Sequence, residues 1–160
     1  MTLIQNFREI RRDGKVIEAG VDMQAILALG WSPDKIVRLE WEADGRTIHR
    51  DCPHGVLAKV LPDRMSIALM EHTPVDTGMR KKLSVIDADG TTRYVIADTH
   101  VINGRALMGV FAWFEPARVE PERCFGVIFQ TVPDADGTQE QYQFDLDIAS
   151  GEIVGAYESR

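Results

Sequence analysis

Three Asp-Gly dipeptides, each preceded by an acidic residue and an alanine, dictate the architecture expected of this chain. They are Asp44-Gly45, Asp89-Gly90 and Asp136-Gly137, separated by 45 and 47 residues, and each stands between two runs of β-forming residues. Aspartate and glycine both tolerate the positive φ of a two-residue hairpin turn, so this pair is a strong hairpin signal. We therefore expect a mainly β protein built from successive antiparallel hairpins.

The polarity of opposed residues tests these turns, because residues that face each other across a hairpin share one face of the sheet. If each turn has two residues, apolar side chains mostly oppose apolar ones. The hairpins around Asp136-Gly137 and Ser150-Gly151 share one strand and predict a three-stranded antiparallel meander. The expected pairs are Trp41 with Ile48, Leu83 with Ile96, Val85 with Tyr94, Val127 with Leu146, Phe129 with Phe144, Thr131 with Tyr142, Ile148 with Ile153 and Phe144 with Tyr157.

Other segments extend the predicted sheets. Residues 56–60 and 65–70 indicate one more pair of strands. A hairpin at Asn103-Gly104 leads into residues 106–115, where both alternate faces are apolar. Because a strand that is apolar on both faces is typically covered on both, we expect this one to lie centrally.

Helix is expected only near the N-terminus. Leu3, Ile4, Phe7 and Arg11 have helical spacing, and residues 22–29 begin with an N-capping aspartate and end before Gly30. These two segments predict one or two short helices.

Length and composition fit a single domain over residues 1–160. The chain has 160 residues, of which 44% are hydrophobic, so it is long enough to bury a core. A repeat of about 46 residues lies in the range of propeller blades, although three units are too few to close a ring. A curved sheet, a sandwich, an open barrel or a propeller-like repeat fits this pattern.

Net charge and the lack of targeting signals limit the expected binding partners and the expected cellular location. The formal charge is -7, which disfavours general attraction to nucleic-acid phosphates or anionic lipid. Residues 1–14 lack the apolar stretch of a secretory signal, and no segment has the length of a membrane span. Two cysteines are too few for a disulfide framework, although a single bridge stays open. We expect a cytoplasmic protein that binds neither nucleic acid nor membrane.

The residues suited to catalysis or metal binding form no complete motif. The hexapeptide 49–54 holds two histidines, a cysteine and an aspartate, but its spacing matches no zinc module, and further ligands would have to come from His100 or Cys124. The alternative is that Cys52 acts as a nucleophile, activated by His54 or His100, with Asp51 or Asp98 orienting the histidine. The Asp-x-Asp-Gly turns lack the rest of a calcium loop. We therefore expect no catalytic residue, cofactor or metal, and favour a non-catalytic role.

The distribution of charge is more informative. Residues 1–80 hold 11 basic and 12 acidic side chains, whereas residues 81–160 hold 7 and 13. No Lys, Arg or His occurs from Cys124 to Ser159, a stretch that contains seven carboxylates. Alternation places Gln141, Gln143, Asp145 and Asp147 on one face of a strand, which predicts an acidic, outward sheet face beside acidic turns.

These features predict a binding protein whose acidic face engages a basic protein partner. Small, acidic chains without a catalytic set resemble bacterial immunity proteins, which neutralise toxins by covering a basic cleft; the resemblance is one of composition. The alternative is a small β-rich enzyme or a ligand- or metal-binding domain that uses the region of Cys52, His54 and His100. The sequence leaves the oligomeric state open. The residues expected to contact the partner are Asp134, Asp136, Glu140, Asp145 and Asp147.

Overall fold

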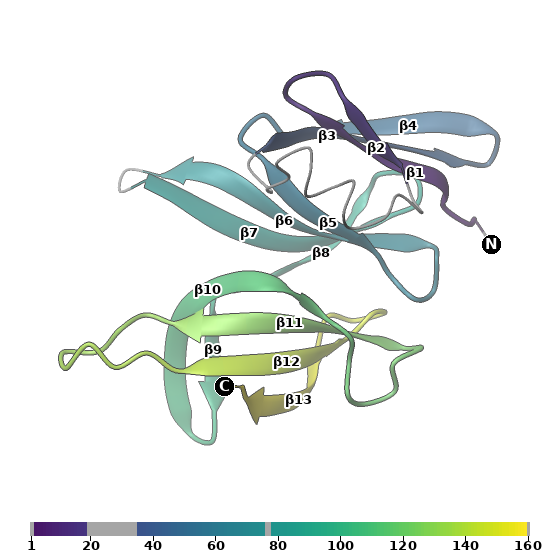
Figure 1. The fold of residues 1–160 in the computed structure, drawn as a ribbon. Helices are drawn as coiled ribbons and strands as arrows, with labels where there is room; N and C mark the ends of the chain where they lie inside the picture. Colours follow the sequence, from purple (N-terminus) through teal and green to yellow (C-terminus); the bar gives the residue numbers. More distant parts are fainter. Residues whose placement is uncertain (1, 19–34, 76–77, 160) are drawn as a thin grey trace.

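A computed structural model describes residues 2–18, 35–75 and 78–159, which form three antiparallel β-sheets (Figure 1). None of the described elements is an α-helix, and the predicted mainly β fold is confirmed. The strands are β1 (Gln5–Arg11), β2 (Val16–Glu18), β3 (Ile36–Ala43), β4 (Arg46–Asp51), β5 (Val56–Val60), β6 (Ser66–Val75), β7 (Gly78–Asp87), β8 (Thr92–Ile96), β9 (Thr99–Ile102), β10 (Arg105–Glu115), β11 (Cys124–Thr131), β12 (Gln141–Asp147) and β13 (Ile153–Glu158).

The sheets are stacked as three layers with two cores between them. The first sheet has the order β2-β1-β3-β4, the middle sheet β5-β6-β7-β8, and the third β13-β12-β11-β10-β9. The three repeated Asp-Gly turns at Asp44, Asp89 and Asp136 lie in three different sheets, so the repeat does not reflect the blades of a propeller. Within the described ranges, no helix is long and apolar enough to cross a membrane.

The middle sheet is the layer that is buried on both faces. Along β6, Ile67 and Leu69 enter the core shared with the first sheet, whereas Ala68 and Met70 enter the core shared with the third. Hydrogen bonds also cross the layers: the indole N–H of Trp41 donates to the Ala88 carbonyl (2.7 Å), and the Tyr94 hydroxyl donates to the Ile148 carbonyl (2.9 Å). The middle sheet therefore joins the two halves of the molecule.

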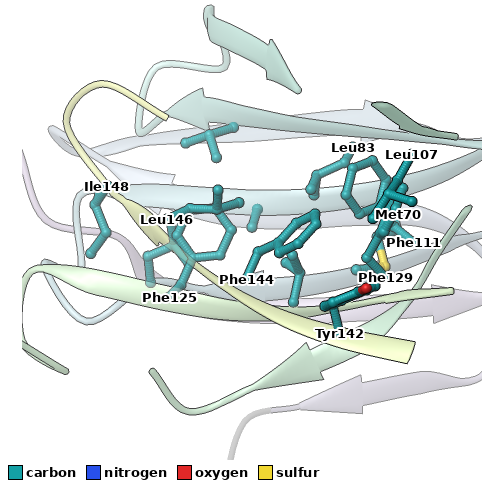
Figure 2. Packing of buried hydrophobic residues seen from close by; sticks show 14 residues of the cluster. Met70, Leu83, Leu107, Phe111, Phe125, Phe129, Tyr142, Phe144, Leu146 and Ile148 are labelled. Carbon is teal, nitrogen blue, oxygen red and sulfur yellow. The ribbon is translucent and has the colours of Figure 1, made fainter. Parts of the chain in front are cut away.

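The third sheet is curled into a half-barrel around an aromatic core, and β10 bends around its end (Figure 1). Figure 2 shows phenylalanines of the half-barrel packed against Met70 and Leu83 of the middle sheet. Tight packing of β10 on β11 depends on Gly109, where a Cβ atom would lie 2.2 Å from the carbonyl oxygen of Gln130.

Three predicted hairpins are correct in their pairing. Trp41 is opposite Ile48, and Asp44 and Gly45 have φ values of 51° and 72°, as the two-residue turn requires. The hairpin at Asn103-Gly104 has the same backbone conformation. In the middle sheet, Leu83 pairs with Ile96 and Val85 with Tyr94, although a bulge widens the turn that follows.

The register of the last two hairpins was predicted wrongly. Phe129 is opposite Tyr142 and not Phe144, a slip of two residues, because the turn around Asp136-Gly137 sits inside a longer loop over residues 132–140. In the last hairpin, Ile153 is opposite Leu146 and not Ile148, because the turn between Asp147 and Glu152 is longer than two residues. A register shift next to Asp145 then places Tyr157 opposite Gln143 and not Phe144. The three-stranded meander itself is confirmed.

The expected helix over Leu3 to Arg11 is wrong. These residues lead into and form β1, which pairs with β2 and β3. Asn6 has a φ of 53°, and the register shifts between Gln5 and Arg8, so the alternation of a strand is interrupted and imitates helical spacing. The second expected helix, over residues 22–29, lies outside the described residues.

Strand β10 is not covered on both faces as expected. Leu107 and Phe111 point into the core, whereas Met108 and Val110 on the opposite face are exposed. Because the half-barrel is an outer layer, one face of its strands has no further layer to pack against.

Candidate partner-binding surface

Asp145, expected on an outward face, is fully buried. Its carboxylate accepts hydrogen bonds from the backbone N–H groups of Arg118 (2.9 Å) and Val119 (3.1 Å), and from the side chain of Gln143 (3.0 Å). Gln143 also donates to the Pro116 carbonyl (3.0 Å). Residues 116–119 therefore cover this face of β12, and the expectation that Gln143 and Asp145 are exposed is wrong.

The other four carboxylates lie at opposite ends of β12. Asp134 and Asp136 are exposed in the loop over residues 132–140, and Glu140 ends that loop. Asp147 follows at the far end of the strand, where it accepts a hydrogen bond from the Ser150 hydroxyl (2.7 Å). The five residues do not form one patch. Contact of the exposed ones with a partner stays a prediction.

Glu140 is held in its ionised form by two neighbours. The Tyr142 hydroxyl donates a hydrogen bond to one carboxylate oxygen, and Arg105 of β10 forms an ion pair with the other at 3.2 Å. The bond from Tyr142, followed by the bonds from Arg105, lowers the pKa of Glu140 below its usual value. Arg105 thus joins the acidic loop to β10 and partly offsets its charge.

Of the residues of the alternative hypothesis, Cys52 and His100 are packed into the fold, whereas His54 is exposed. Cys52 is buried in the core of the first sheet, and its thiol lies 3.6 Å from a Glu71 oxygen. Burial, reinforced by Glu71, raises the pKa of Cys52 to about 12, so the thiolate needed for nucleophilic attack is disfavoured. Cys124 is also a free, buried cysteine.

His100 belongs to the aromatic core of the half-barrel and is not grouped with Cys52. Its ring makes edge contacts with Phe144 (5.2 Å between centroids) and Phe129 (5.6 Å), and its Nε2 lies 2.6 Å from the Ala97 carbonyl oxygen. Across the described parts of the chain, no three His, Cys, Asp or Glu side chains are close enough to hold a metal ion.

The outer face of β10, which the sequence analysis expected to be covered, carries a row of exposed apolar side chains. Met108 and Val110 are 58% and 45% exposed, and Trp113 follows after a bulge in the strand. Val101 on β9 joins them because it pairs with Ala106, and Val132 because its N–H donates to the Met108 carbonyl. We call these residues the apolar strip: Val101, Met108, Val110, Trp113 and Val132.

Acidic residues border the apolar strip. A hollow between β10 and the loop over 132–140 is lined by Met108, Val132, Asp134 and the Glu140–Arg105 pair. At the other end, Glu115 accepts a hydrogen bond from the indole N–H of Trp113 (2.7 Å). The signal in the sequence is the alternation around Gly109, which separates the inward Leu107 and Phe111 from the outward Met108 and Val110.

No family model and no curated protein matches the chain. A solved structure, described as the structure of Tne2 in complex with Tni2, contains a chain that is 33% identical to this one. The match covers 99% of this chain and 100% of that chain, with a TM-score of 0.84. The chain belongs to the family of that protein.

Membership of this family extends over the whole described fold. Because the match covers both chains almost completely, the first sheet, the middle sheet and the half-barrel are all shared. The homologue from the Tne2–Tni2 complex is bound to another protein, so at least one member of the family has a protein partner.

Proposed function

We propose that the chain is the immunity-type member of a toxin–immunity pair and neutralises its toxin by binding to it. The observation that supports this most directly is the full-length match to a protein in the Tne2–Tni2 complex. The compositional resemblance to immunity proteins points the same way. An immunity protein acts in the compartment where its toxin acts, and we propose that this compartment is the cytoplasm.

The chemistry of the described residues favours binding over catalysis. The thiol of Cys52 is buried beside Glu71, which stabilises its protonated form, and the His100 ring is packed among phenylalanines. Cys52 and His100, on which the alternative hypothesis depends, are therefore packed into the fold. A partner surface is all that neutralisation by binding requires.

The partner proposed here is basic where it meets the chain. The net charge of this chain is -7, and its exposed Asp134 and Asp136 attract a cationic surface. Such attraction accelerates association by roughly 10–10³-fold at low salt.

The test uses the cognate counterpart, meaning the homologue, from this chain's own genome, of the protein that faces the matched chain in the Tne2–Tni2 complex. Bacteria that express this counterpart should stop growing, and co-expression of the chain should restore growth. The two purified proteins should elute together in size-exclusion chromatography. A harmless counterpart, or a toxic one that the chain neither binds nor neutralises, would overturn the proposal.

A further inference from the structure

We propose that the apolar strip is the surface on which the partner docks, and that the partner fits it with an apolar protrusion ringed by Lys or Arg. The inference rests on the proposed function, because it names the surface through which neutralisation would occur. Its supports are the contiguity of the strip, its composition, its rigidity and the charge of its border.

The strip is contiguous because its residues lie on neighbouring strands of one sheet. Val101 is opposite Ala106, and the Val132 N–H donates a hydrogen bond to the Met108 carbonyl. Val110 lies two residues after Met108 on the same face of β10. Single exposed apolar side chains are ordinary, but a cluster bordered by polar residues marks an interaction site. Methionine and tryptophan are also enriched in protein interfaces, where they supply the central contacts.

The strip is also held rigid from within. Leu107 and Phe111 are buried in the half-barrel core between the exposed residues of β10, and Gly109 brings this strand close to β11. The bond from Trp113 to Glu115 fixes the orientation of the indole ring. A surface ordered before binding loses little conformational entropy when a partner docks.

The charge of the border determines the kind of partner. Asp134 and Glu140 lie at one end of the strip, with Asp136 in the same loop, and Glu115 lies at the other end. Two cations near them are engaged: Arg105 forms an ion pair with Glu140, and Lys81 donates to the Ala112 carbonyl. A partner with a basic rim around an apolar centre is therefore complementary in both respects, and an acidic rim is repelled.

The first experiment changes the centre of the strip and measures the Kd for the cognate counterpart by isothermal titration calorimetry. We expect Val110→Glu and Trp113→Ala each to weaken binding by about 10-fold or more, as for central interface residues. The control is Val154→Glu, at a side chain that is 48% exposed on β13 of the same sheet and outside the strip. It should bind like the wild type.

A second variant tests the charged border. Asp134→Asn combined with Asp136→Asn should lower the association rate several-fold at low salt and flatten its dependence on ionic strength, because rim charges act mainly on encounter. The dissociation rate should change little. Circular dichroism and thermal melting should show that each variant folds like the wild type; Trp113→Ala gives a second reading of the strip if Val110→Glu does not fold.

The outcomes separate this inference from the proposed function. If the wild type binds the counterpart and both strip variants bind equally well, the strip is not the interface, while the proposed function stands. If Val154→Glu weakens binding as much as Val110→Glu does, the docking surface lies elsewhere and the inference fails. If the wild type itself does not bind, the proposed function fails first.

Discussion

At the scale of single residues, His100 links the chemistry of a side chain to the stability of the half-barrel. Its imidazole makes edge contacts with Phe111, Phe129 and Phe144, and its Nε2–H donates to the Ala97 carbonyl. Burial lowers the pKa of His100 below the usual 6.5, and the bond to Ala97 opposes that shift only in part. The folded protein therefore favours the neutral ring.

This shift predicts a loss of stability in mild acid. As the pH falls below about 6.5, the unfolded chain binds a proton at His100 before the folded chain does, so the free energy of unfolding decreases until the pH reaches the lower pKa of the folded state. His100→Gln keeps a donor for Ala97 and should remove this part of the pH dependence in urea unfolding. His54→Gln, at an exposed histidine, should leave it unchanged. A wild-type slope in the His100 variant would contradict the assignment.

Asp145 shows what sequence reasoning can establish about one side chain. Alternation correctly places it on the face of β12 opposite Phe144, which is buried in the half-barrel core. It cannot reveal that residues 116–119 fold back over that face to bond with the carboxylate. Gly126 leaves room for the end of β10, from which this segment starts, because a Cβ there would lie 2.6 Å from the Glu115 carbonyl oxygen. Such a contact between segments distant in sequence has no local signature.

At the scale of elements, turn length decides which hairpins can be predicted. Asp44-Gly45 forms the tight turn that its composition predicts, so the register follows. The Asp136-Gly137 pair lies within a longer loop, and the resulting slip of two residues leaves every side chain on its predicted face. The polarity test cannot detect such a slip, because side chains alternate with a period of two. The faces of β11 and β12 were therefore predictable and their partners were not.

Gly109 is the element-scale feature that allows β10 to approach β11. Gly109→Ala should lower the free energy of unfolding by about 2–4 kcal/mol, because the new methyl group meets the rigid backbone of Gln130 and overpacks the contact. Gly155→Ala is the matched control, since its methyl group meets only the movable ring of Tyr157. Chemical denaturation of both variants measures the difference. Equal effects would mean that close approach at Gly109 is not required.

At the scale of the whole molecule, the two cores depend on one shared layer. The sequence places apolar runs at 66–70 and 83–86, but it does not say which of several apolar runs lies in the middle. The prediction assigned that position to residues 106–115 and so missed the exposed side chains of the apolar strip. The difference arises from the stacking order of the sheets. The third sheet is an outer layer, so the outer face of its strand β10 is exposed although both faces of the strand are apolar.

The shared layer predicts that the protein unfolds as one unit. Leu69 points into the core shared with the first sheet, so Leu69→Ala should lower the free energy of unfolding by about 2–5 kcal/mol. Because β6 also supports the half-barrel through Met70, the loss should destabilise β12 equally. This holds although Leu69 is not part of the half-barrel core, to which β12 contributes. Trp41 fluorescence, with Trp31 and Trp113 replaced by Phe, reports the first core, and hydrogen exchange of β12 amides reports the second. Both should shift by the same free energy. A half-barrel that keeps its wild-type protection while the Trp41 transition shifts would mean that residues 1–160 comprise two units that unfold separately.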